Sequence, residues 1–227
     1  MKNFNIENFY EKLFELSDAQ NQKFGANLLP NIDEKLILGI KFPKLRTFTK
    51  KFFADVNIYE FLDALPHKYF EENIIHTFLV SDMKDYSECL AAVKKFLPYI
   101  DNWSVCDVFA PIIFKKHTDE LEPEILQWLD SDEEYIVRFG LLMLMKYYPF
   151  AEKYLDLVAK IRCDKYYAQM MAGLYFTMAL AKNYDAAVVY LEEKRLPKWI
   201  HRKTLQKVKE SRLISEERKN YLRGLKF

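Results

Sequence analysis

The chain has 227 residues with a net charge of +1; half are apolar and 16% are aromatic. This composition can bury a substantial core, which excludes an intrinsically disordered protein. No apolar run reaches the roughly 18–20 residues that a membrane helix needs, and the acidic N-terminus is unlike a signal peptide. Cys89, Cys106 and Cys163 lack metal or redox spacing and are typical of reduced thiols, so we expect a cytoplasmic location.

Helical patterns follow one another along the chain. Glycine is scarce, with 5 residues, and no Asn-Gly or Asp-Gly hairpin signal appears. Several of the 8 prolines lie where a helical pattern begins or ends. In chain order, the predicted helices span residues 4–17, 19–28, 33–38, 43–54, 56–63, 69–82, 84–97, 102–116, 119–130, 133–148, 150–162, 165–182, 184–193, 198–211 and 215–225.

Short helices joined by short loops predict an all-α fold. We expect an α-α superhelix of HEAT-like helical repeats with a concave groove, built as a single domain over residues 1–227. The repeat would be a helix pair of about 30–40 residues. No residue-level consensus is evident along the chain, so a compact, non-repeating all-α domain stays open as an alternative. Residues 133–148 are apolar nearly all round, which predicts a helix buried on most sides.

A tryptophan and a carboxylate lie four residues apart in the segment IDNWSVCDVF, residues 100–109. Asp101 or Asn102 can cap the helix that follows. Trp103 and Asp107 would then project from one helix face, where the carboxylate could stabilise a developing cation or orient a water molecule. The same spacing is also common in core packing, with the tryptophan buried and the aspartate in a salt bridge.

Arg138 is the charged residue within an otherwise apolar run, residues 135–145. Burial of a guanidinium without a partner is costly, so we expect either an acidic partner or an anionic ligand. Asp107 is one candidate partner, and a phosphate held by the planar guanidinium is the other. The local sequence leaves both open.

Two segments concentrate basic residues that suit phosphate. Lys44, Arg46 and Lys50 lie at the start of the helix that follows Pro43. Residues 194–227 hold 12 Lys and Arg against 3 Asp and Glu, a balance of +9, whereas residues 1–193 hold 22 against 30, a balance of −8. Arg202, Lys203 and Lys207 belong to this C-terminal surplus. Each segment could instead be a solvated helix face.

Other common site chemistries have no sequence support. The chain lacks the glycine-rich phosphate-binding motifs and the GxSxG nucleophile motif. Its 4 histidines show no metal-ligand spacing, so we expect no metal site.

Five stretches in one order resemble the AlkD-like DNA alkylation repair family. They are ILGIKFPKLR (37–46), IDNWSVCD (100–107), YIVRFGLLMLMKYY (135–148), YYAQMMAGLYF (166–176) and IHRKTLQKVKESRLISEERKNYL (200–222). The resemblance implies a superhelix that accepts duplex DNA, acting as a monomer without metal or redox cofactor. Active members are monofunctional glycosylases that release cationic alkylpurines such as 7-methylguanine and 3-methyladenine.

The resemblance also assigns roles to residues. Asp107 would be the catalytic carboxylate, Trp103 an aromatic wall, and Arg138 a contact to the DNA backbone near the lesion. The basic residues come from the charge pattern described above, and with DNA as the ligand we expect them to bind it: Lys44, Arg46, Lys50, Arg202, Lys203 and Lys207.

Three features depart from the family pattern. Active relatives carry a second tryptophan where this chain has Leu174 followed by Tyr175. The N-terminal part is shorter, and Arg202 stands where asparagine is common. Two functions therefore stay open: an alkylpurine DNA glycosylase, or a catalytically silent HEAT-like scaffold that binds nucleic acid or protein.

Overall fold

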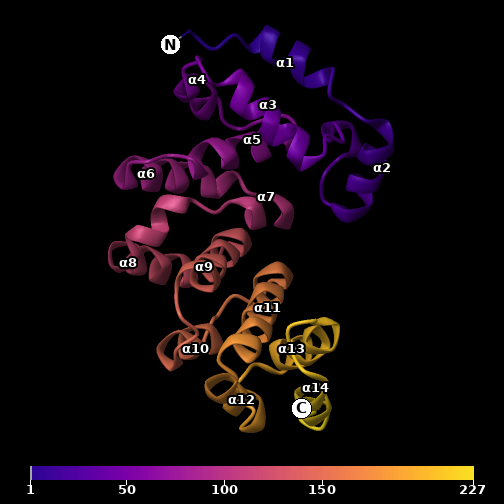
Figure 1. The fold of residues 1–227 in the computed structure, drawn as a ribbon, viewed down its shortest axis with the longest axis vertical. Coiled ribbons are helices and arrows are strands. Elements are labelled where there is room, and N and C mark those ends of the chain that lie inside the picture. Colours follow the sequence, from indigo (N-terminus) through magenta and orange to yellow (C-terminus); the bar gives the residue numbers. More distant parts are fainter. Residues whose placement is uncertain (1) are drawn as a thin grey trace. The chain divides into compact units, whose positions relative to one another are not determined.

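The computed structural model describes residues 2–227, and these residues form an all-helical fold. They contain 14 α-helices, three short 3-10 helices and one isolated bridge between Lys2 and Val56, with no strand (Figure 1). The all-α prediction is therefore confirmed. None of the helices in this described part combines the length and apolar character that a membrane crossing requires.

The chain divides into two compact units, Met1–Lys116 and His117–Phe227. Unit 1 contains α1 (Ile6–Phe14), α2 (Ala19–Leu28), α3 (Phe42–Phe52), α4 (Ile58–Asp63), α5 (Phe70–Ser81), α6 (Tyr86–Phe96) and α7 (Trp103–Val108). Unit 2 contains α8 (Thr118–Leu129), α9 (Glu134–Tyr147), α10 (Glu152–Ala159), α11 (Tyr166–Lys182), α12 (Tyr184–Glu192), α13 (Lys198–Glu210) and α14 (Glu216–Arg223). The expectation of a single domain with one groove stays a prediction.

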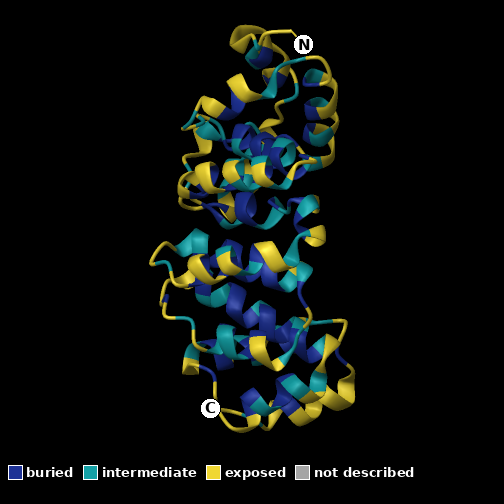
Figure 2. Cartoon of the chain, turned by 90° about the vertical axis from the view of Figure 1, so that its left-hand side faces the viewer, coloured by how far each residue is buried: buried dark blue, intermediate teal, exposed yellow. Residues whose placement is uncertain are grey.

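Each unit has a two-layer helical order. In unit 1, α5 packs between α3 and α7 in a first layer, and α4 and α6 pack onto α5 from a second layer. In unit 2, α11 packs between α9 and α13 in the first layer, while α8, α10, α12 and α14 belong to the second. This order, in which each pair stacks on the next, is that of an α-α repeat fold. Buried residues lie between the layers within each unit (Figure 2).

Local sequence signals explain where many helices begin. The Asn102 side chain accepts a hydrogen bond from the Val105 N–H at 2.9 Å and caps α7, and Ser215 caps α14 in the same way. In α9, every residue from Val137 to Leu144 is buried, as a sequence that is apolar nearly all round predicts.

The predicted helix over residues 102–116 is wrong in its second half. The α-helix ends at Val108, and a separate 3-10 helix covers Ile112–Lys116. Pro111 explains the break, because it has no N–H to donate and its ring restricts the residue before it. The predicted helix over residues 33–38 is also shorter, a single 3-10 turn at Glu34–Leu36.

The Glu71 carboxylate anchors the segment that connects α2 with α3. It accepts hydrogen bonds from three successive backbone N–H groups, those of Leu38, Gly39 and Ile40, at 2.9, 2.8 and 3.1 Å. Burial raises the pKa of Glu71, while these three donors act in the opposite direction because they stabilise the ionised form. Gly39 has a φ of +77°, which allows three neighbouring N–H groups to converge on one carboxylate.

Two histidines form a pair in unit 1, in which His76 is buried and His67 is half-buried. His67 Nε2 lies 2.9 Å from His76 Nδ1, and the rings stack on Phe61 and Phe96 respectively. Burial lowers the pKa of His67 from 6.5 to about 4, and burial together with the neighbouring His67 and Lys95 lowers the pKa of His76 as well. Both imidazoles are therefore neutral in the folded protein at neutral pH.

Replacement of Gly39 by alanine should destabilise the protein strongly. A Cβ at this position would lie 2.2 Å from the Asp18 carbonyl oxygen and 2.4 Å from the Gln22 nitrogen. We expect the free energy of unfolding to fall by about 2–4 kcal/mol in denaturant titrations. Gly25→Ala is the matched control: its Cβ would make an ordinary 3.4 Å contact with Ile37, and removing a mid-helix glycine should stabilise by about 0.5–1 kcal/mol. Equal effects of the two substitutions would contradict the argument.

Acidification should destabilise the protein through the His67–His76 pair. Because the folded pKa values lie below those of the unfolded chain, the unfolded state binds more protons as the pH falls from 6.5 towards 4. Stability that is fully present above pH 6.5 is therefore lost in this window, by about 2–4 kcal/mol between pH 7 and pH 5. Urea titrations at the two pH values measure this loss. His67→Gln should shrink the difference, and an unchanged difference would argue against the pair as its source.

Candidate functional site

Helix α7 places Trp103 and Asp107 one turn apart on the same side. Ser104, Val105 and Cys106 are buried and fix the helix in unit 1, while Trp103 and Asp107 are half-buried. The prediction that the two side chains share a helix face is confirmed, because both line the same pocket.

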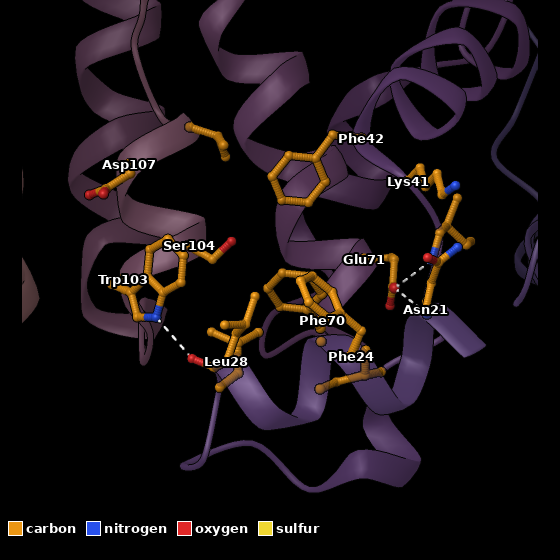
Figure 3. A pocket seen from close by; sticks show the side chains of 16 residues that line it. Asn21, Phe24, Leu28, Lys41, Phe42, Phe70, Glu71, Trp103, Ser104 and Asp107 are labelled. Atoms are coloured by element: carbon orange, nitrogen blue, oxygen red, sulfur yellow. Dashed lines mark hydrogen bonds between the residues drawn. The ribbon is translucent and has the colours of Figure 1, made fainter. Parts of the chain in front are cut away.

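This pocket has a volume of about 420 Å³ and lies entirely within unit 1 (Figure 3). It is formed by α2, the segment that Glu71 anchors, the first turns of α3 and α5, and α7. Its walls are mainly apolar and aromatic: Phe24, Leu28, Leu29, Ile37, Ile40, Phe42, Phe70, Trp103 and Val108. Such a cavity with few polar groups is typical of a ligand site.

Trp103 connects two walls of the pocket. Its indole Nε1–H donates a hydrogen bond to the Leu28 carbonyl oxygen at 3.1 Å, which ties α7 to the last residue of α2. Across the pocket lie Phe42 and Phe70 (Figure 3). Trp103 is therefore held in place by a hydrogen bond while its ring lines the pocket.

Two carboxylates line the pocket, in different environments. Glu71 is buried and committed to backbone N–H groups, so its charge supports structure. Asp107 is half-buried at the pocket's edge, and its carboxylate points away from Phe42 and Phe70 (Figure 3). Asp107 is consequently better placed than Glu71 to face a charged reactant outside the apolar part of the pocket.

The basic residues predicted on α3 do not share one surface. Lys44 lies against a second hollow, lined also by Lys12 and Lys51, and its Nζ donates to the Leu16 carbonyl at 3.3 Å. Arg46 forms a 2.5 Å ion pair with Asp82. Lys50 is exposed near the end of α3.

Lys41, rather than these three, lines the pocket with Trp103 and Asp107. The sequence interpretation passed over it, although its position directly before the start of α3 was a usable signal.

Arg138 is buried in unit 2, with 3% of its surface exposed. Its guanidinium donates a hydrogen bond to the Tyr167 carbonyl at 2.8 Å and lies 6.0 Å from the centre of the Tyr167 ring. These contacts join α9 to the first turn of α11. Arg138 therefore has a structural role in unit 2, whatever ligand it contacts.

The C-terminal basic residues occupy different positions on α13. Arg202 is exposed and lines a hollow of about 290 Å³ together with Lys209 and Lys226. Lys203 lies over the Trp199 ring, 5.2 Å from its centre, and Lys207 forms a 2.8 Å ion pair with Glu210.

The residues at the position of the second tryptophan have different environments. Tyr175 is fully buried in unit 2, where its ring contacts Phe150 and Phe176. Leu174 is half-buried on the same helix. Tyr175 therefore cannot offer an aromatic face to a ligand, and Leu174 has no aromatic ring.

An aromatic residue recurs in the first turn of every first-layer helix. It is the first residue of α3, α5 and α7 (Phe42, Phe70 and Trp103), and the second residue of α9, α11 and α13 (Tyr135, Tyr167 and Trp199). Four of these lie at a constant interval of 32 residues, at positions 103, 135, 167 and 199. The view that no residue-level repeat exists is thus wrong at this one position. A comparison of the sequence with itself at fixed offsets could have found it.

No group of three or more His, Cys, Asp or Glu side chains within residues 2–227 is arranged to hold a metal ion.

Comparison with known proteins gives one family. A family model described as DNA alkylation repair enzyme matches residues 10–167, more than half of the chain. The match includes Trp103, Asp107 and Arg138, whereas Arg202, Lys203 and Lys207 lie beyond it. No curated protein and no solved structure gives a significant match.

Loss of the indole N–H should loosen α2. Trp103→Phe keeps an aromatic ring but removes the hydrogen bond to Leu28, so we expect the free energy of unfolding to fall by about 1 kcal/mol. Hydrogen exchange of the α2 amides should become faster, while exchange in α13, which belongs to unit 2, should not change. Unaltered exchange in α2 would show that the contact does not tie this helix.

Proposed function

The chain belongs to the DNA alkylation repair enzyme family, and from this premise we propose that it is a monofunctional DNA glycosylase. Its substrates would be cationic alkylpurines in duplex DNA, such as 7-methylguanine and 3-methyladenine. The observation that carries the proposal is the placement of Asp107 and Trp103 one turn apart on α7, at the edge of an aromatic pocket.

The chemistry requires little from the protein. Alkylation gives the purine a positive charge, so the base departs with the electron pair of the glycosidic bond as a neutral molecule. The deoxyribose then gains oxocarbenium character, which a carboxylate stabilises. Water adds to C1′ and loses a proton, which Asp107 is suited to accept. The products are the free base and an abasic site.

The surroundings of Asp107 suit this role. The Trp103 ring lies beside it, and an aromatic face favours a nearby positive charge. The Glu71 carboxylate is held by backbone N–H groups and supports the wall of the pocket. Lys41, on the same pocket, is suited to contact a phosphate next to the damaged nucleotide.

Other basic residues would contribute to DNA binding unequally. Lys44, Lys50, Arg202 and Lys203 are the best candidates for phosphate contacts among those that the sequence suggests. Arg46 and Lys207 already form ion pairs within the protein, so a phosphate would have to compete with Asp82 and Glu210. Arg138 would act mainly by holding Tyr167 in place.

A scaffold without catalytic activity is the second candidate. Two observations favour it: Leu174 and the buried Tyr175 offer no second aromatic wall, and the net charge of +1 is small for a duplex DNA binder. In this alternative, Asp107 and Trp103 would serve packing and binding only.

The charge of Asp107 should control base release. Asp107→Asn keeps the side-chain shape and removes the negative charge that opposes the oxocarbenium ion. We expect release of 7-methylguanine from methylated duplex DNA to fall at least about 10-fold, near 1.4 kcal/mol of barrier. The measurement is the rate of base release under single-turnover conditions.

Asp101→Asn is the matched control, because Asp101 is an exposed carboxylate just before α7 that does not line the pocket. It should retain the wild-type rate. Release that is unaffected by Asp107→Asn would keep the enzyme and remove Asp107 from its mechanism. No release by the wild type would favour the scaffold.

A further inference from the structure

Four aromatic rings form a continuous row across the first layer of unit 2. Tyr135 and Tyr167 are stacked, with ring centres 5.7 Å apart and planes at 29°. Tyr166 contacts Tyr167 edge-to-face at 5.0 Å and Trp199 at 5.7 Å. The row connects the first turns of α9, α11 and α13, and we call it the aromatic row.

The aromatic row lies at the surface. Tyr166 is 53% exposed, and Tyr135, Tyr167 and Trp199 are half-buried. Core aromatics of this unit, such as Phe139 and Phe176, are fully buried. Exposed aromatic rings that are already ordered by their neighbours can accept a planar ligand at a small cost in conformational entropy.

Positive charge accompanies the row. The Lys203 ammonium lies 5.2 Å from the centre of the Trp199 ring, and Lys165 precedes Tyr166 with half of its side chain exposed. Arg138 donates a hydrogen bond to the Tyr167 carbonyl and so helps to hold this part of the row.

Two of the nearby acids have partners within the protein. Glu133 lies 3.9 Å from Lys165, and the Glu134 carboxylate accepts the Tyr167 N–H. The row thus combines ring faces with cations that can contact phosphate.

We propose that the aromatic row binds unpaired bases of DNA by stacking, with Lys203 and Lys165 contacting the backbone. Aromatic side chains interleaved with cations are typical of surfaces that bind single-stranded nucleic acid, because every base has a π face whatever its sequence. Membership of a DNA repair family favours DNA over other planar ligands, such as sugars or peptides. Binding should therefore tolerate changes in base sequence.

This inference goes beyond the proposed glycosylase. The row lies in unit 2, whereas Asp107 and its pocket lie in unit 1. Stacking of unpaired bases needs neither a lesion nor bond cleavage, so the two proposals can be tested separately.

The test compares two single strands of equal length and charge. One is a 12-nucleotide oligothymidylate, and the other contains the same sugar-phosphate chain without bases. The full-length protein should bind the strand with bases at least about 5-fold more tightly, because stacking contributes to one complex only. Equal affinities would overturn the inference, since they would mean that cations bind the backbone alone.

Variants then locate the binding surface. Tyr166→Ala removes the most exposed ring of the row and should abolish most of the preference for the strand with bases. Tyr221→Ala is the matched control, because Tyr221 is 52% exposed on α14 and is no part of the row. Equal losses in both variants, or none in Tyr166→Ala, would contradict the proposal.

Two further measurements test the role of Lys203 and separate this inference from the proposed glycosylase. Lys203→Gln should weaken binding of both strands to a similar extent, because it removes a backbone contact. A different result, such as weaker binding of the strand with bases alone, would overturn the role of this lysine. Absence of base release from methylated duplex DNA, with preference for the strand with bases retained, would remove the glycosylase and leave the aromatic row intact.

Discussion

The contact between one buried carboxylate and three successive backbone N–H groups determines the geometry of unit 1. Glu71 is the second residue of α5, yet it holds a segment more than 30 positions earlier in the chain. Burial of a carboxylate is costly unless donors surround it, and here three successive donors converge because the backbone takes a left-handed turn. Gly39 supplies that turn. The wall of the pocket between α2 and α3 therefore needs both residues: Glu71 to accept the hydrogen bonds and Gly39 to orient the donors.

The pocket in turn separates two physical environments. Its apolar side consists of rings from α2, α3 and α5, where charge would be poorly solvated. Asp107 stands at the edge, with the Trp103 ring between it and that apolar side (Figure 3). A positively charged sugar would be stable beside the carboxylate and unstable deeper in the pocket. In the proposed glycosylase, this gradient would orient the reacting sugar towards Asp107.

The sequence predicted much of this organisation, for identifiable reasons. Periodicity and proline positions predict helices close to those observed. The cap of α7 is predicted at Asp101 or Asn102, because side-chain capping is a local interaction, and the structure has it at Asn102. The role of Glu71 cannot be predicted from the sequence, because the N–H groups that it binds are distant in the chain. Arg46 was interpreted as a DNA contact, although Asp82 binds it from a neighbouring helix. Charge runs in a sequence do not reveal which charges the protein itself neutralises.

The 32-residue interval gives equivalent positions in successive repeats. One turn after each aromatic residue at 103, 135, 167 and 199 stand Asp107, Phe139, Met171 and Lys203. The same location in the repeat therefore carries an acid, two apolar residues and a base, while the preceding ring is kept. At the two half-buried members, Asp107 and Lys203, the charge one turn after the ring differs in sign, whereas Phe139 and Met171 lie in the core. The repeat thus keeps an aromatic residue at one position, while the residue four positions later determines the charge beside it.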